Sequence, residues 1–298
     1  SLTKRFGQMQ LRLKEHIEEL KHETQQRERL NSELRTANEI QQSLLPATPY
    51  IHDSKAGLEL AAFLQPARAV GGDLYYYYID DNESHPLLRF VIGDVSDKGV
   101  AAAIFMARVV TAIKAIAVHT VDPAEILTTL NSQLVEDNDA CMFVTLLSGT
   151  LNLNTGELQL ASAGHPMPLL IESSHKATQI EQINGPAIGM YECEYSSINT
   201  TLKPNTYLFA YTDGLDEAAN TKMELYGSER ILSALSNPAP STAKGLINDI
   251  IKDVKQFVGD AEPADDLTLL AIHWSGSQES RADNMISITS DTQELEKI

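Results

Sequence analysis

Short hydrophobic runs bounded by glycine or turn residues recur along the second part of the chain, and such runs predict buried strands. The runs are Leu58–Leu64, Leu87–Ile92, Met142–Leu153, Glu157–Ala163, Tyr207–Tyr211 and Leu267–Trp274. The third and fourth flank Asn154-Thr155-Gly156, which is typical of a hairpin turn. Hairpins without strand–helix–strand units favour antiparallel sheets covered by helices, so the sequence predicts an α+β fold.

Helical patterns separate some of these strands. Residues Val100–Val118 are rich in alanine and apolar on most sides, which suits a buried helix. Asp122-Pro123-Ala124-Glu125 has the residue types of a helix start. Ser228–Leu235 and Thr242–Phe257 complete the predicted helices.

Residues 1–45 differ from the rest because they are dense in charged residues, glutamine and leucine, with apolar positions three and four apart. This stripe resembles a heptad repeat that turns polar at Thr24–Arg27. A helix this long cannot bury its stripe alone, so we expect either a parallel homodimer or a helix folded back on the globular part. Pro46 and Pro49 end the helix. The predicted organisation is a coiled-coil helix over 1–45, a globular domain over 46–274, and a polar linker with a further segment over 275–298.

Composition limits the function classes. The formal net charge of −18 argues against nucleic acid or an anionic membrane surface as the main partner. Cys141 and Cys193 lack zinc-ligand spacing and a disulfide framework, which favours a reduced, cytoplasmic setting. No apolar run approaches the roughly 20 residues of a membrane span. The chain starts at Ser1, so we expect an excised fragment.

Four aspartates sit where a hydrophobic run meets a glycine-rich or acidic turn: Asp73, Asp94, Asp213 and Asp265. A carboxylate at a buried strand end is costly unless it is paired or binds a cation. Hard oxygen ligands without His or Cys point to Mg²⁺ or Mn²⁺. The sequence therefore predicts one carboxylate-lined metal site.

Each aspartate has a simpler alternative. Asp73 follows two glycines and suits a turn, and Asp94 suits the cap of the helix that begins near Lys98. Asp213 before Gly214 is a turn signature. Asp265 suits a charged strand entry.

Five segments together resemble a known family. They are VGGDLY (70–75), GDVSDKGVAAAIFMA (93–107), FVTLLSGTLNLNTGELQLASAGHP (143–166), YTDGLDEA (211–218) and DDLTLL (265–270). In this order they resemble the metal-dependent protein Ser/Thr phosphatases (PPM, type-2C-like), and more narrowly the SpoIIE/RsbU-type bacterial partner-switching branch. ANEIQQSLLP (37–46) is similar to the helical lead-in of that branch. The resemblance implies an antiparallel β-sandwich flanked by helices, with two Mn²⁺ or Mg²⁺ ions held at one end.

Carried over residue by residue, the resemblance implies that Asp94 bridges both ions and that the Val95 carbonyl lies near one. Asp213 and Asp265 would complete one ion's ligands and Asp73 the other's, partly through water. Asp266 would support the ligands. The ions would activate a water that hydrolyses the phosphoester.

Four further residues remain open. Arg68 is a candidate phosphate clamp or a surface ion-pair partner. Lys98 is a solvated lysine or faces the phosphoprotein. His165 suits a structural turn or a proton donor. Tyr76 stands where the family often has an acidic residue, although the run Tyr75–Tyr78 itself predicts a strand with alternating faces.

The two ends carry short resemblances. Residues 6–13 are similar to the end of a HAMP signalling helix, and 285–295 to the start of an anti-sigma-type kinase domain. These suggest the cytosolic part of a membrane-anchored receptor.

The sequence thus predicts a phosphoprotein phosphatase acting on a small regulatory protein, by resemblance a phosphorylated anti-sigma factor antagonist. The alternative is a catalytically silent scaffold that dimerises and binds partners. A nucleotide cyclase, suggested by Gly71-Gly72-Asp73 alone, lacks a nucleotide loop.

Overall fold

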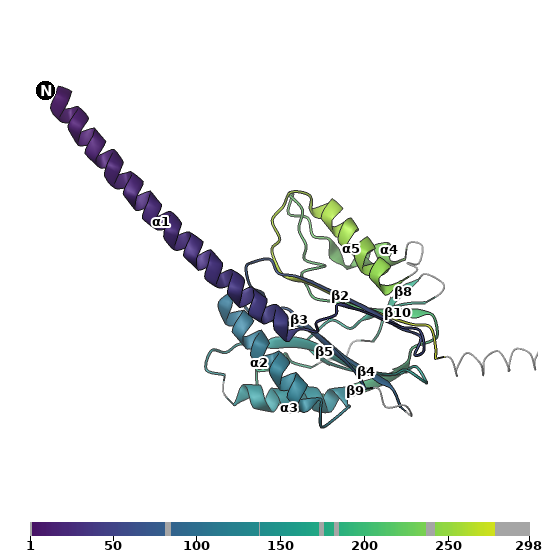
Figure 1. Ribbon diagram of the computed structural model, residues 1–298. Helices are drawn as coiled ribbons and strands as arrows, with labels where there is room; N and C mark the ends of the chain where they lie inside the picture. The colour runs from purple at the N-terminus through teal and green to yellow at the C-terminus, as the bar shows by residue number, and fades with distance from the viewer. Residues whose placement is uncertain are drawn as a thin grey trace, which may run out of the picture.

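The computed structural model describes residues 2–80, 85–136, 138–172, 176–181, 185–236 and 242–277. Two antiparallel sheets lie face to face, and helices cover both outer sides (Figure 1). This confirms the predicted α+β sandwich with its N-terminal helix. The predicted kinase-like segment at 285–295 lies outside the described residues, as do the side chains of the predicted HAMP-like segment at 6–11.

The first sheet has six strands in the order β1-β2-β11-β10-β7-β8. They are β1 (Tyr50–Asp53), β2 (Leu58–Gln65), β11 (Leu267–Trp274), β10 (Thr206–Tyr211), β7 (Leu169–Ile171) and β8 (Ala177–Gln179). The second sheet has five strands in the order β3-β4-β5-β6-β9. They are β3 (Leu74–Asp80), β4 (Leu87–Val95), β5 (Val144–Asn152), β6 (Glu157–Ala163) and β9 (Ser197–Thr201).

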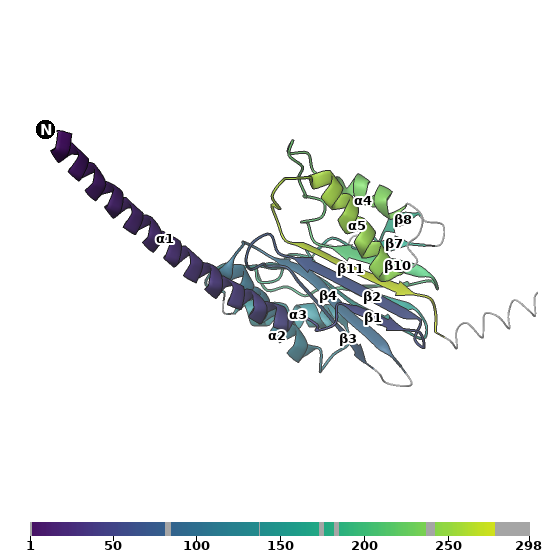
Figure 2. The same ribbon diagram turned by 45° about the horizontal axis from the view of Figure 1, so that its top comes forward.

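Five helices are described. They are α1 (Leu2–Leu44), α2 (Val100–Ile116), α3 (Pro123–Val135), α4 (Gly227–Leu235) and α5 (Ala243–Val258). Figure 2 shows α4 and α5 on the outer face of the six-stranded sheet, and α2 and α3 on that of the five-stranded sheet. The predicted cap of α3 is present, since the Asp122 carboxylate accepts a hydrogen bond from the Ala124 amide at 2.9 Å.

Three apolar layers hold the fold together. The inner faces of the two sheets enclose Phe90, Leu60 and Trp274, all about 1% exposed or less. A second layer joins the five-stranded sheet to α2 and α3, and a third joins the six-stranded sheet to α4 and α5. The tyrosine run behaves as predicted, because Tyr75 and Tyr77 enter the layer between the sheets.

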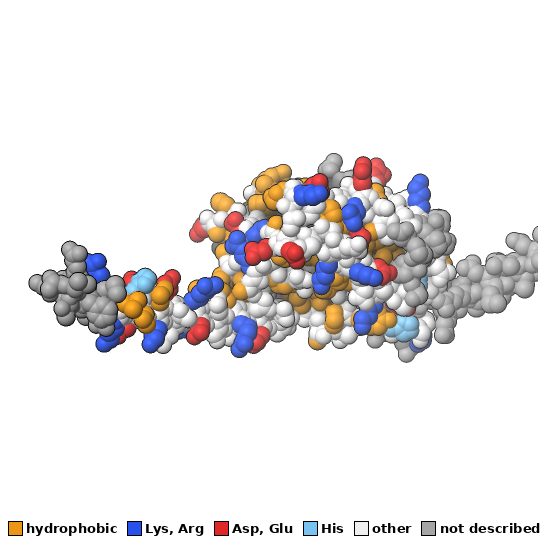
Figure 3. Space-filling view, turned by 90° about the horizontal axis from the view of Figure 1, so that it is seen from above, with side chains coloured by type: hydrophobic (Ala, Val, Ile, Leu, Met, Phe, Trp, Pro, Cys, Tyr) orange, Lys and Arg blue, Asp and Glu red, His pale blue; other side chains and the backbone are white. Residues whose placement is uncertain are grey.

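Helix α1 extends far beyond the globular part, with hydrophobic side chains exposed among charged ones (Figure 3). Only its last turns reach the domain, where Leu44 packs beside α2 and the Leu44 carbonyl accepts a hydrogen bond from Lys114 Nζ at 2.6 Å. Neither the fold-back alternative nor dimerisation follows from this single chain, and the homodimer stays a prediction. In the described part of the chain, no helix combines the length and apolarity that crossing a membrane requires.

The strand pairing explains why distant aspartates meet. In antiparallel pairs the end of one strand lies beside the start of the next. Leu74 at the start of β3 pairs with Gly93 near the end of β4, and Tyr211 at the end of β10 pairs with Leu269 near the start of β11. The residues at or just outside these four strand ends therefore share one end of the sandwich.

Candidate active site

Asp73 lies deepest in the site, immediately before β3, and is 2% exposed. Its Oδ2 accepts hydrogen bonds from Thr212 Oγ1 at 2.8 Å and Thr268 Oγ1 at 2.6 Å. Burial, followed by the charge of Asp94, raises the pKa of Asp73 well above its usual range, and the two threonine hydroxyls oppose that rise. Asp73 is thus a fixed carboxylate in a site that disfavours its charge.

Asp94 and Asp213 extend the cluster toward solvent. Burial raises the pKa of Asp94 to about 7; the charge of Asp213 adds to the rise, and a hydrogen bond with Asp73 opposes it. The pKa of Asp213 is raised by burial and then by Asp265. Neighbouring carboxylates therefore repel one another, and nearby positive charge is needed to keep the group ionised.

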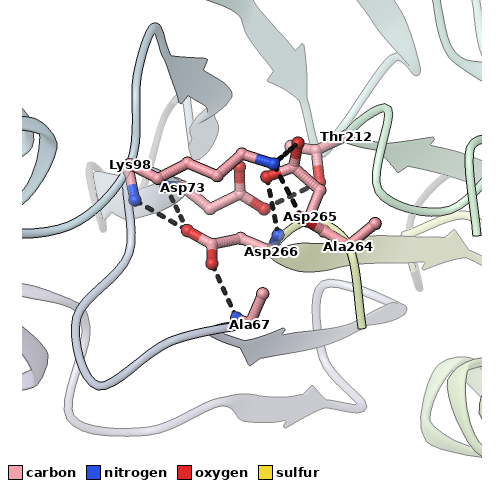
Figure 4. Close-up of polar contacts among 8 residues, drawn as sticks. Ala67, Asp73, Lys98, Thr212, Ala264, Asp265 and Asp266 are labelled. Carbon is pink, nitrogen blue, oxygen red and sulfur yellow. Dashed lines mark hydrogen bonds and ion pairs between the residues drawn. The ribbon is translucent and has the colours of Figure 1, made fainter. Parts of the chain in front are cut away.

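Lys98 supplies one positive charge. Its Nζ lies 2.6 Å from Asp265 Oδ2 and donates a hydrogen bond to the Ala264 carbonyl at 2.7 Å (Figure 4). The side chain reaches across the mouth of the site from the turn after Asp94. Lys98 is therefore not simply solvated, because it connects the turn after Asp94 to Asp265 and Ala264.

Asp266 has a different role from Asp265. Its carboxylate is 7% exposed and accepts backbone N–H bonds from Ala67 and Gly72, both at 2.7 Å, and a longer one from Asp73 at 3.4 Å (Figure 4). The loop of residues 66–73 is thereby tied to the start of β11. Asp266 thus holds the backbone on both sides of the glycines that precede Asp73, and its charge also acts on Asp73 and Asp94.

The glycines before Asp73 make this approach possible. A Cβ atom on Gly71 would collide with the Asp266 carboxylate, and one on Gly72 would lie 2.9 Å from the Val95 carbonyl oxygen. The second contact places the Val95 carbonyl beside the Asp73 loop. Both positions require glycine because neighbouring backbone and a buried carboxylate occupy the space.

The end of α1 holds the same loop from the other side. Gln41 Nε2 donates to the Gly71 carbonyl at 2.6 Å, and the Gly71 amide donates back to Gln41 Oε1 at 3.3 Å. Asn38 Nδ2 donates to the Ala69 carbonyl. Helix α1 is therefore bonded to the loop that carries Asp73.

His165 is buried behind the cluster. Its Nε2 lies 3.1 Å from the Tyr211 carbonyl and its Nδ1 lies 2.9 Å from Thr145 Oγ1. A carbonyl only accepts, so Nε2 carries the proton and Nδ1 accepts from the threonine. Burial lowers the pKa of His165 to about 4. This neutral imidazole links β5 to the end of β10.

Two other open residues lie apart from the carboxylates. Arg68 is exposed on the 66–73 loop, and no ion pair within the described ranges includes it. Tyr76 points toward α2, where Lys114 Nζ lies 5.2 Å from its ring centroid. Tyr76 thus packs between the helices and the five-stranded sheet, while Arg68 stays a candidate phosphate clamp.

The structure also bears on the simpler alternatives. Helix α2 begins after Gly99 without a side-chain cap, so Asp94 is not its N-cap. Asp73, Asp94, Asp213 and Asp265 act on one another electrostatically, which separate turns and a strand entry would not require. Sequence reasoning missed Thr212, Thr268 and Gln41. The signal for the threonines was a polar residue at a buried position, within β11 for Thr268 and directly after β10 for Thr212.

The donor set fits hard divalent cations. The facing groups are carboxylates, with a backbone carbonyl beside them, and oxygen donors without imidazole or thiolate suit Mg²⁺ and Mn²⁺. Over the described residues no three acidic, histidine or cysteine side chains already converge at ligand spacing. Asp265 is also engaged by Lys98, whose ammonium contacts its Oδ2.

Comparison with known proteins places this chain in a family. The family model for stage II sporulation protein E (SpoIIE) matches residues 85–275, more than half of the chain. Protein IcfG from Synechocystis is 28% identical over 272 residues, covering 81% of this chain and 41% of that protein. Phosphoserine phosphatase RsbU from Bacillus subtilis is 24% identical over 247 residues, covering 82% of this chain and 70% of RsbU. The chain thus spans less than half of IcfG.

Solved structures share the fold. The SiaA-PP2C domain of Pseudomonas aeruginosa matches with a TM-score of 0.68 at 23% identity, covering 83% of this chain and 98% of that domain. The RsbU and RsbW domains of Rv1364c from Mycobacterium tuberculosis match with a TM-score of 0.60 at 26% identity, covering 78% of this chain and 62% of that one. The family match shows that the chain belongs to the SpoIIE family, and the structural similarities show that it has the fold of the PP2C domain of SiaA.

Proposed function

We propose that this protein is a metal-dependent phosphoprotein phosphatase that removes phosphate from serine or threonine of a small regulatory protein. The observation that carries the proposal is that Asp73, Asp94, Asp213 and Asp265 lie at one end of the sandwich, near enough for their charges to act on one another. The similarity to phosphoserine phosphatase RsbU supports the reaction. By the same similarity, the substrate we propose is a phosphorylated anti-sigma factor antagonist.

Asp94 is the proposed ligand common to two Mn²⁺ or Mg²⁺ ions. Asp213 and Asp265 would hold one ion, and Asp73 with the Val95 carbonyl would help hold the other. When bound, the two ions would supply a water of lowered pKa and neutralise charge on the phosphoryl group.

The protein's own groups prepare the site. Thr212 and Thr268 fix the orientation of Asp73. Lys98 keeps a positive charge at the mouth of the site, and Arg68, exposed on the 66–73 loop that carries Asp73, is the proposed phosphate clamp. The scaffold alternative is not favoured, because it gives no reason for a cluster of buried and half-buried carboxylates that repel one another.

The test is Mn²⁺ titration by calorimetry together with phosphate release from a phosphoserine protein. Asp94→Asn should abolish turnover almost completely and weaken Mn²⁺ binding by more than the roughly 10–100-fold typical of a supporting residue. Asp97→Asn is the matched control. Asp97 is exposed at a positive φ of 67°, which asparagine tolerates, and its change removes the same charge three residues away.

Full Mn²⁺ affinity in Asp94→Asn would refute the assignment of that residue. Undiminished phosphate release in excess chelator would refute the metal-dependent reaction itself.

A further inference from the structure

A cavity of about 400 Å³ opens beside the carboxylate cluster. It lies between the C-terminal half of α5, the loop of residues 259–265 and the turn that follows Asp213. Lys98, Gly214 and Asp265 belong both to its lining and to the candidate active site. A volume of this size is within the range of ligand-binding pockets.

One wall of this α5 cavity is apolar. Ile251, Val254 and Val258 line it and are spaced three and four residues apart, so they share one face of α5. Leu267 at the start of β11 continues the same wall. The cavity therefore offers a surface for a hydrophobic side chain immediately next to a strongly polar site.

The rim is charged. Glu217, Lys255 and Glu262 surround the opening and are exposed, while Lys98 is already paired with Asp265. The three free rim charges therefore sum to a net negative charge. Such a rim favours a basic or neutral segment over an acidic one.

We propose that the α5 cavity binds an apolar side chain of the phosphoprotein substrate, within about two residues of the phosphorylated serine or threonine. In an extended segment, side chains two residues apart point the same way and are about 7 Å apart. A substrate whose phosphate reaches the aspartates therefore presents a neighbouring side chain past Lys98 and Asp265 to the apolar wall. This proposal rests on the proposed phosphatase function and adds a determinant of substrate choice.

The test compares two phosphoserine peptides that differ only in carrying Leu or Ser at both positions two residues from the phosphoserine. Binding is measured by fluorescence anisotropy, turnover by phosphate release, and p-nitrophenyl phosphate serves as a substrate too small to reach the cavity. Burying a leucine side chain should favour the Leu peptide about tenfold or more in affinity and in kcat/KM.

Two variants fill the cavity from different sides: Val258→Trp from α5, and Ala261→Phe from the adjoining loop. Each should remove the preference for the Leu peptide and leave turnover of p-nitrophenyl phosphate unchanged. Gln256→Trp is the matched control, because Gln256 is exposed on the same helix outside the cavity, and it should keep the preference. Thermal unfolding of all variants verifies that they fold, and the loop variant replaces the helix variant if the latter does not.

Equal binding of the two peptides by the unmodified protein would overturn the proposal, as would a preference that survives in the filled variants. If the cavity instead binds a small molecule, the two peptides should bind equally well. If the proposed phosphatase function is wrong, no substrate is turned over. The difference in affinity between the two peptides still shows whether the cavity binds the apolar side chain.

Discussion

Asp266→Asn tests how the protein holds Asp73 in place. The carboxylate accepts two short backbone bonds on different oxygens, from Ala67 on Oδ1 and from Gly72 on Oδ2. Asparagine keeps one oxygen, and its amide nitrogen then faces the other backbone N–H. One charge-assisted bond is lost, at about 1.5–3 kcal/mol, and one buried donor is left without a partner, at about 1–3 kcal/mol.

The two losses together predict a decrease of about 2.5–6 kcal/mol in the free energy of unfolding, a large part of the 5–15 kcal/mol typical of a domain. Urea denaturation followed by circular dichroism measures it. Because the 66–73 loop carries Asp73, we also expect weaker Mn²⁺ binding by calorimetry, although Asp266 itself is not a proposed ligand.

Asp260→Asn is the control, since it removes the same charge from an exposed position near α5 and should change stability by less than about 0.5 kcal/mol. A similarly small effect for Asp266→Asn would show that the three backbone bonds do not hold the loop. The supporting role assigned to Asp266 would then be wrong.

Three further predictions concern other parts of the chain. The pKa of His165 is about 4 in the folded protein against an ordinary value of 6.5, so protonation between these pH values favours the unfolded state. As pH falls from 6.5 to 4, the free energy of unfolding should therefore decrease by about 3 kcal/mol more in the unmodified protein than in His165→Gln. Parallel curves of stability against pH for the two proteins would contradict this. Replacing both Cys141 and Cys193 with serine should leave turnover intact, because no thiolate takes part, and loss of activity in the folded double variant would count against a water nucleophile. Helix α1 is expected to form the homodimer and is bonded to the loop that carries Asp73, so deleting residues 1–36 should yield a monomer in sedimentation with altered Mn²⁺ dependence. An unchanged dimer with unchanged kinetics would refute both dimerisation through α1 and its coupling to the metal site.

Long elements were predictable from the sequence because their periodicity repeats over several residues. Helix α5 and strands such as β5 and β11 lie within a few residues of their predicted limits. The short strands β1, β7, β8 and β9 were not predicted. Strands of three to five residues contain too few alternations to be distinguished from loops.

The sequence also singled out the four aspartates, because acidic residues at the glycine-rich ends of hydrophobic runs are unusual. Its motifs further identified the family, which the comparisons confirm. From the sequence, the different roles of the adjacent residues Asp265 and Asp266 could be assigned only by resemblance to the family. The structure gives the physical reason, since only Asp266 lies within reach of the Ala67 and Gly72 amides.

Tertiary structure alone decided the roles of Thr212, Thr268, Gln41 and Lys98. Threonine is an ordinary strand residue, and glutamine and lysine are ordinary helix or surface residues, so nothing local marks them. Their roles depend on partners far away in sequence: Thr268 bonds Asp73 across 195 positions, and Lys98 bonds Ala264 across 166. Such contacts depend on the order in which strands pair, and this order is set by packing of the whole sandwich rather than by any local pattern.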